Sequence, residues 1–250
     1  MSFRILLASS ILIACDADES TNTPPGPQDE FSDSEDIPTP GDDVDDIEPD
    51  DSDTIETGPV TYSFDDVDSL IYVQVFKDED AWGAALAHDH VIRASSWSGS
   101  VELDVEDLSS CNLSFELPVQ QLIVDEAGMR ELVGYDQEVS DDDRDEIRDN
   151  MLSSEQLNVS SHDTISFVGS NCQGGDDTLM VDGEMTVAGG TGRFTVELAM
   201  VISDGRLYLQ GGIDAEHDDF GMTPYSAYGG FVRNNDPLLF TIDVVGTPTE

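Results

Sequence analysis

The segment Leu86-Ala87-His88-Asp89-His90-Val91-Ile92-Arg93-Ala94, which continues to Trp97-Ser98-Gly99, is the stretch around which the rest of the chain is organised. It places two histidines two residues apart between apolar residues. Side chains alternate between the two faces of a β-strand, so both imidazoles would point to the same side. A Trp-Ser-Gly-Ser bend and the alternating residues 101–105 follow. We therefore expect this pair to face the inside of a wall built by the remaining strands.

Short segments that alternate apolar and polar residues recur through most of the chain. The sequence Asp204-Gly205 between two of them is typical of a hairpin turn. Many short strands with glycine-rich turns predict an antiparallel barrel or sandwich with an apolar interior. The predicted strands are residues 62–64, 70–76, 101–106, 112–117, 122–125, 164–168, 179–187, 193–198, 207–209 and 238–245.

One helix interrupts the strands. Ser140 can cap it, and the three carboxylates of residues 141–143 suit the positive end of the helix dipole. Ile147, Met151 and Leu152 give this helix a single apolar stripe.

The charge of the chain restricts its partners. Its 250 residues include 55 acidic and 9 basic ones, for a formal charge of -46. Such a surface repels phosphate backbones, so we expect no nucleic-acid partner. We interpret most of this charge as a hydrated surface that keeps the protein soluble.

The N-terminus has the features of an export signal. Residues 5–14 are almost wholly apolar and too few to span a bilayer. Their ending at Cys15 resembles the bacterial lipoprotein box, which implies a signal peptide over residues 1–14 and lipidation of Cys15. The alternative is an ordinary secretory signal with a chance cysteine. We expect a protein that is anchored by lipid in the envelope of a Gram-negative-type bacterium and faces the periplasm or the exterior.

Residues 15–60 are acidic and rich in proline, and their few apolar residues are isolated. We expect a disordered, extended tether here, followed by a single domain over residues 61–250. With Cys15 lipidated, Cys111 and Cys172 remain as a pair. Each lies next to a predicted strand, and antiparallel pairing of those strands would bring both cysteines to the same end. We therefore expect a disulfide between them.

The order of these elements resembles the YceI-like family of lipid- or polyisoprenoid-binding proteins. The resemblance rests on His90 with residues 97–101, on residues 122–125, and on the helix 143–152 with the strand after it. It also rests on residues 182–189 and, most clearly, on His217-Asp218-Asp219-Phe220-Gly221-Met222-Thr223-Pro224-Tyr225-Ser226. It implies an extended lipocalin-like antiparallel β-barrel, whose apolar pocket holds a long isoprenoid or fatty-acyl chain without catalytic residues or another cofactor. The chain departs from the family in its lipoprotein signal, its acidic tether and His217, where glutamine is common.

Several side chains are candidates for such a pocket. The histidines allow three interpretations: contact with a ligand head group, packing in the core, or metal binding by His88, His90 and His217, as a metal-binding module or a metal-dependent enzyme. Sequence motifs of serine hydrolases, phosphate-binding loops and CxxC redox sites are missing, so we expect a binding protein and no enzyme. The candidate pocket residues are His88, His90, Trp97, His217, Phe220, Met222 and Tyr225.

Overall fold

The computed structural model describes residues 58–175 and 177–249. The expectations for Cys15 and for residues 1–14 lie outside this part of the chain, as does almost all of the expected tether. The strands are β1 (Val60–Phe64), β2 (Leu70–Lys77), β3 (His90–Ala94), β4 (Ser98–Leu103), β5 (Asn112–Pro118), β6 (Leu122–Val124), β7 (Thr164–Gly175), β8 (Thr178–Val187), β9 (Gly190–Ser203), β10 (Arg206–Glu216), β11 (Ser226–Ala227) and β12 (Val232–Pro248). The helices are α1 (Ala127–Leu132) and α2 (Asp141–Leu152), with short 3-10 turns η1 (Ala84–Leu86), η2 (Leu108–Ser110), η3 (Val119–Gln121) and η4 (His217–Phe220).

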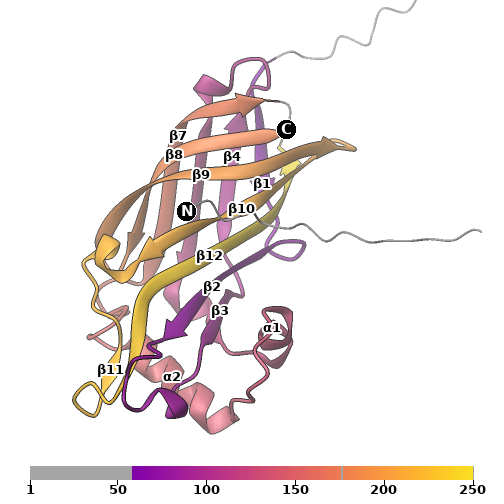
Figure 1. The fold of residues 1–250 in the computed structure, drawn as a ribbon. Coiled ribbons are helices and arrows are strands. Elements are labelled where there is room, and N and C mark those ends of the chain that lie inside the picture. Colours follow the sequence, from indigo (N-terminus) through magenta and orange to yellow (C-terminus); the bar gives the residue numbers. More distant parts are fainter. Residues whose placement is uncertain (1–57, 176, 250) are drawn as a thin grey trace, which may run out of the picture. The chain divides into compact units, whose positions relative to one another are not determined.

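Eight antiparallel strands form a closed barrel in the order β1-β4-β5-β7-β8-β9-β10-β12, and pairing of β1 with β12 closes the ring (Figure 1). The expected antiparallel barrel is confirmed. Closure removes the free edges that an open sheet would expose.

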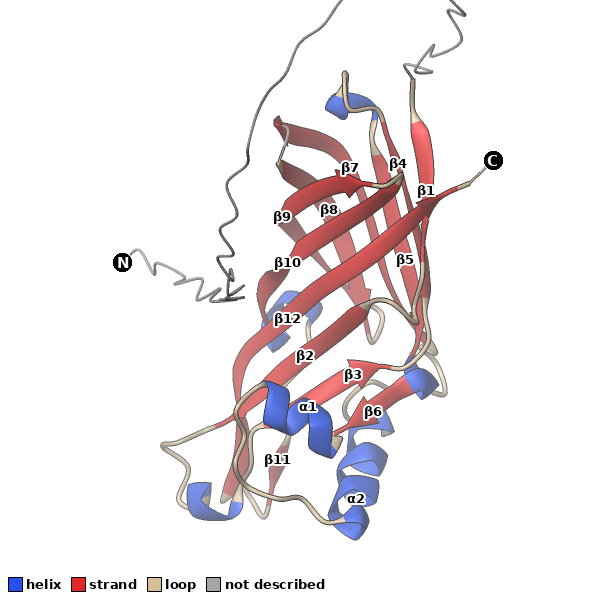
Figure 2. Cartoon of the chain, turned by 90° about the vertical axis from the view of Figure 1, so that its right-hand side faces the viewer, coloured by secondary structure: helices blue, strands red, loops and turns tan. Residues whose placement is uncertain are grey.

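The long strand β12 pairs with two further strands of the same sheet, besides β10, along its length. Its last residues pair with β1, where Tyr62 lies opposite Pro248, and its middle pairs with β2, where Val75 lies opposite Leu238. Strands β3 and β6 continue from β2. Figure 2 shows β2, β3 and β6 at one end of the barrel, with α2 beneath them.

The half of the barrel away from β2, β3 and β6 is filled by its own side chains. Inward positions alternate with exposed ones along each strand, as period-two patterning requires. The inward Leu103, Leu179, Val181, Leu207 and Leu209 are each at most 1% exposed. This half is therefore an ordinary packed core.

A layer of aromatic rings crosses the barrel below this core. Trp97 lies between Phe64 and Phe115, each at 6.1 Å between ring centroids, and Phe115 stacks on Phe167 at 5.6 Å. Gly183 makes room for the layer, because a Cβ there would lie 2.2 Å from Cζ of Phe167. A side chain at this inward position would displace the ring.

The turn at Asp204-Gly205 and the N-terminal cap of α2 agree with the predictions from the sequence. Asp204 and Gly205 have φ values of 51° and 73°, the left-handed conformation that a tight hairpin requires. Ser140 Oγ accepts a hydrogen bond from the backbone N–H of Asp143 at 3.2 Å and so caps α2. The sequence did not predict α1, which has only 6 residues.

Within the described residues, no helix has the length and apolar character needed to cross a membrane.

The disulfide between Cys111 and Cys172 is confirmed, with 5.8 Å between the two Cα atoms. Its basis is the predicted one: β5 and β7 pair antiparallel, with Asn112 opposite Ser170. Several strands are longer than predicted, because their outer ends face solvent and lack the apolar alternation. β7 reaches Gly175, for example, and β12 begins at Val232.

Candidate functional site

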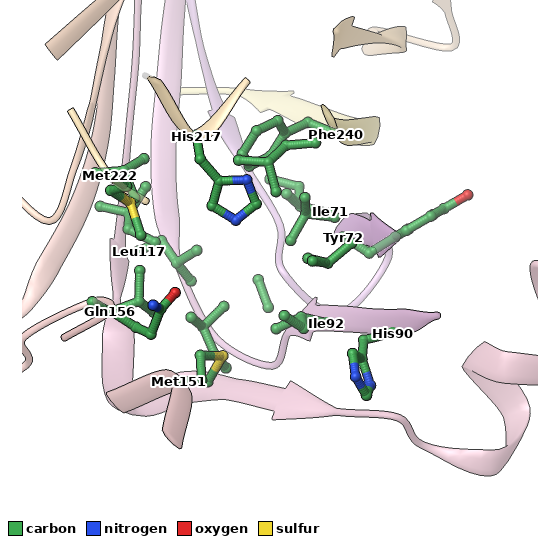
Figure 3. A pocket seen from close by; sticks show the side chains of 18 of the residues that line it. Ile71, Tyr72, His90, Ile92, Leu117, Met151, Gln156, His217, Met222 and Phe240 are labelled. Atoms are coloured by element: carbon green, nitrogen blue, oxygen red, sulfur yellow. The ribbon is translucent and has the colours of Figure 1, made fainter. Parts of the chain in front are cut away.

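A cavity of about 180 Å³ occupies the half of the barrel that is not filled (Figure 3). Strands of the barrel and the neighbouring strands β2, β3 and β6 form its walls, and α2 and the segment after η4 cover it. Its lining consists of Ile71, Tyr72, Val73, Val75, His90, Ile92, Ala94, Trp97, Phe115, Leu117, Leu122, Ile147, Asn150, Met151, Gln156, Leu157, Ile165, Met185, Val187, Ile213, His217, Met222, Tyr225, Asn234, Leu238, Phe240 and Ile242.

The aromatic layer limits the depth of the cavity. Phe115, Ile213 and Ile242 line its inner end and also line a second void of about 10 Å³ on the side of the packed core. That second void is about the size of one water molecule. An apolar ligand that enters the cavity would therefore end at these three side chains.

His217 presents one ring nitrogen to the cavity. Its Nδ1 lies 2.7 Å from the backbone carbonyl oxygen of Asp236. Because a carbonyl only accepts hydrogen bonds, the proton of the neutral ring is on Nδ1, and Nε2 carries a lone pair. Figure 3 shows the ring pointing into the cavity, so Nε2 can accept a hydrogen bond from a ligand.

Gln156 offers a second acceptor. Its Nε2 donates to the carbonyl oxygens of Glu155 at 3.0 Å and Thr223 at 3.3 Å. These bonds fix the orientation of the amide, and Oε1 accepts no hydrogen bond from the residues that the structure describes. The lining thus combines an apolar wall with a few polar groups that can orient a ligand.

His90 lies at the other side of the cavity and belongs to a buried ionic network. Its Nδ1 donates to Oδ2 of Asp125 at 2.7 Å. Oδ1 of Asp125 accepts from Nη1 of Arg130 at 2.7 Å and from the backbone N–H of Val91 at 3.0 Å. Asp125 is fully buried and Arg130 nearly so, which makes this the charged anchor between β3 and the start of α1.

The environment of Asp125 has opposing effects on its pKa. Burial raises the pKa, whereas the hydrogen bond and charge of His90, the Val91 N–H and the Arg130 guanidinium lower it. The hydrogen bonds and charges prevail, so the pKa lies below its ordinary value. Asp125 is therefore ionised at neutral pH and balances the charge of Arg130.

A family model for the YceI-like domain matches residues 62–244, which include every strand of the closed barrel except the ends of β1 and β12. The chain belongs to the YceI-like family. BcnA of Burkholderia cenocepacia is a similar structure, with a TM-score of 0.54 and 13% identity over 74% of this chain and 99% of that protein. The Campylobacter jejuni YCEI protein has a TM-score of 0.43 and 8% identity over 64% and 84% of the two chains. At 13% identity the likeness to BcnA shows a shared fold alone. A search of curated proteins found none that matches this chain.

Most of the predicted pocket residues do line the cavity of this YceI-like barrel. They are His90, Trp97, His217, Met222 and Tyr225. Their role in binding stays a prediction.

Two predicted pocket residues lie elsewhere. Phe220 packs against Phe194, with 5.8 Å between ring centroids, and is 3% exposed in the core. His88 precedes β3, which begins at His90, so the expected strand containing both histidines is wrong. The reason is the 3-10 turn Ala84–Leu86, after which the chain reaches β3 only at His90.

The metal hypothesis for His88, His90 and His217 is not supported. Among the residues with a described position, no group of three His, Cys, Asp or Glu side chains could hold a metal ion. Nδ1 of His90 is bonded to Asp125, and Nδ1 of His217 is directed to a backbone carbonyl. The two histidines that reach the cavity therefore have separate partners.

Sequence reasoning missed Gln156 and the partners of His90. Asp125 appeared only as the last residue of a predicted strand, and the sequence shows no pattern that pairs it with Arg130. Two other cations form salt bridges with distant carboxylates: Arg93 Nε lies 2.6 Å from Glu126, and Arg233 pairs with Asp78.

Proposed function

We propose that this YceI-like protein binds and carries a single elongated apolar molecule, of the isoprenoid or fatty-acyl type, in the barrel cavity. The family and the barrel fold are those of binding proteins. The observation that carries the proposal is the unfilled apolar cavity of about 180 Å³ inside an otherwise close-packed barrel. A void of similar size, about 150 Å³ and apolar, is enough to bind benzene.

The energy of binding comes from burial of the ligand. Each buried methylene contributes roughly 0.8 kcal/mol, before the costs of immobilising the ligand are subtracted. His217 and Gln156 then fix the polar end of the ligand, while the apolar chain extends toward Phe115. This arrangement holds a molecule without a chemical step.

We further propose that lipid on Cys15 tethers the barrel to the envelope. The apolar run before Cys15 supports this proposal, and so does the disulfide, which is typical of proteins in an oxidising compartment. The acidic residues 16–60 would hold the barrel away from the membrane surface. We expect Cys15→Ser to move the protein from the membrane fraction to the soluble fraction after cell lysis. Equal distribution of both proteins would contradict the anchor.

A variant that fills the cavity tests the binding proposal. Ile213 is 5% exposed and points inward from β10, whereas Tyr208 on the same strand is 38% exposed and points outward. We expect Ile213→Trp to weaken binding of an apolar fluorescent probe at least tenfold, because the indole occupies the cavity. Tyr208→Trp should bind as the wild type does, and thermal melting of both variants would check their folding. Equal affinity of the folded Ile213→Trp protein and the wild type would contradict binding in this cavity.

A further inference from the structure

We propose that the cavity selects an amphiphile whose head group is uncharged and donates a hydrogen bond, as a hydroxyl does, and that it rejects anionic amphiphiles. The inference rests on the proposed function and adds the chemical class of the ligand to it. Three features of the described residues carry it: the partners of the cations, the polarity of the cavity lining, and the charge around the cavity.

The described part of the chain offers no free cation to an anionic head group. Of the 9 Lys and Arg residues, Arg4 lies outside the described part. Arg148 donates to the backbone and side-chain oxygens of Gln120, and each of the others forms an ion pair with an Asp or Glu. The lining residues include neither Lys nor Arg. A carboxylate or phosphate bound there would lose its hydration without gaining a counter-charge, which is costly.

A cationic head group would also lack a counter-charge in the cavity. The described residues that line the cavity include neither Asp nor Glu. The buried carboxylate nearest to the lining, Asp125, is already paired with Arg130 and His90. A buried ammonium would therefore also lack a partner, and an uncharged head group remains.

Two polar groups of the lining, His217 and Gln156, each have a free atom that accepts hydrogen bonds. His217 has its proton on Nδ1, so Nε2 accepts, and the amide of Gln156 is fixed with Oε1 as its free acceptor. A hydroxyl can donate to either atom, whereas an ester or ether oxygen cannot donate. Asn150, Asn234 and Tyr225 can both donate and accept, so they can complete the remaining bonds of a hydroxyl.

The negative charge around the cavity also disfavours anionic ligands. Burial, followed by the charge of Glu146, raises the pKa of Tyr225 in the lining, with a further contribution from Glu155. A carboxylic acid placed beside Tyr225 would be subject to the same burial and charge and would resist ionisation. The formal charge of -46 on the whole chain also repels anions as they approach.

Three ligands with the same alkyl chain test the proposal on the intact protein. Decanol, decanoate and decylammonium would be titrated at pH 8, and their binding measured by displacement of an apolar fluorescent probe. At this pH decanol is uncharged, decanoate is anionic and decylammonium is cationic. We expect decanol to bind at least tenfold more tightly than either charged ligand. If decanoate or decylammonium binds as tightly as decanol, the head-group assignment is overturned while binding of apolar chains stands. If none of the three binds, the proposed function itself fails.

A positive charge introduced into the lining should reverse the preference for uncharged ligands. Gln156→Lys adds the missing cation, and we expect it to improve decanoate binding relative to decanol at least tenfold. Gln156→Met is the matched control: it removes the acceptor without adding charge, so decanol binding should weaken roughly fivefold and decanoate should gain nothing. The Gln156→Met protein also separates loss of the acceptor from loss of folding. An unchanged preference in folded Gln156→Lys protein would overturn the proposal.

Discussion

Replacement of Asp125 by asparagine is expected to lower the free energy of unfolding by about 3–5 kcal/mol, the usual cost of removing one partner from a buried ion pair. The carboxylate is fully buried, and its Oδ1 lies 2.7 Å from Nη1 of Arg130. Asparagine keeps the size of the side chain but loses the charge, which leaves the guanidinium buried and uncompensated. Arg130 is 5% exposed, so water cannot replace the lost partner. Urea denaturation followed by fluorescence would measure the difference.

An exposed pair provides the control for this variant. Glu184 and Arg193 form an ion pair with side-chain exposures of 52% and 85%. Glu184→Gln should cost less than about 1 kcal/mol, because solvent screens such a pair. Equal effects of Asp125→Asn and Glu184→Gln would show that the network around Asp125 does not hold β3 and α1 together.

The contribution of Asp125 should also depend on pH. Its pKa in the folded state is depressed, so its ionised form stabilises the fold above the unfolded value of about 3.9, and this stabilisation is lost as the pH falls through the folded pKa. The stability gap between wild type and Asp125→Asn should therefore be full at pH 7 and should narrow below about pH 4. Unfolding curves at both pH values would measure it. A gap that is independent of pH would contradict ionisation of Asp125 in the fold.

Removal of the disulfide is the second change with a large expected effect. Cys111 and Cys172 are 61 residues apart, and closing such a loop restricts the unfolded chain by about 4 kcal/mol in the chain-entropy model. We expect the double variant Cys111→Ala/Cys172→Ala to lose roughly that much free energy of unfolding, with the native barrel otherwise retained.

Denaturation of the wild type in the presence of a reductant is the matched comparison. Reduction opens the same loop without changing any residue, so it should reproduce most of the loss. The double variant itself should not respond to the reductant. If the denaturation midpoint of the wild type is unaffected by complete reduction, the cross-link does not stabilise the fold.

The sequence predicts the barrel because apolar and polar residues alternate along each strand, and successive side chains of a strand point to opposite faces of the sheet. In β8, for example, Leu179, Val181, Met185 and Val187 are buried, and the exposed Met180, Asp182 and Glu184 lie between them. The positive φ values of Asp204 and Gly205 likewise follow from the residue types alone. The disulfide followed from strand order once antiparallel pairing was assumed. The alternation and the turn needed no knowledge of distant contacts, and the disulfide needed only that one pairing.

Other features depend on contacts between distant segments and could not be read from the sequence. The partition of β12 between β1 and β2 is set by strand registers that no local pattern specifies. The pairing of Asp125 with His90 joins residues 35 apart in the chain. The inner end of the cavity is formed jointly by Phe115 from β5, Ile213 from β10 and Ile242 from β12. Each of these side chains also fits an ordinary core position.

Native mass spectrometry of the protein purified from its own membranes tests the central claim most directly. The account predicts one bound apolar molecule per barrel in the wild type, and none in the Ile213→Trp protein purified in the same way. Extraction and fragmentation of the released molecule would then identify its head group. A wild-type protein that carries no such molecule from its membranes, and takes none up when lipid is added, would contradict the claim that this barrel is a carrier.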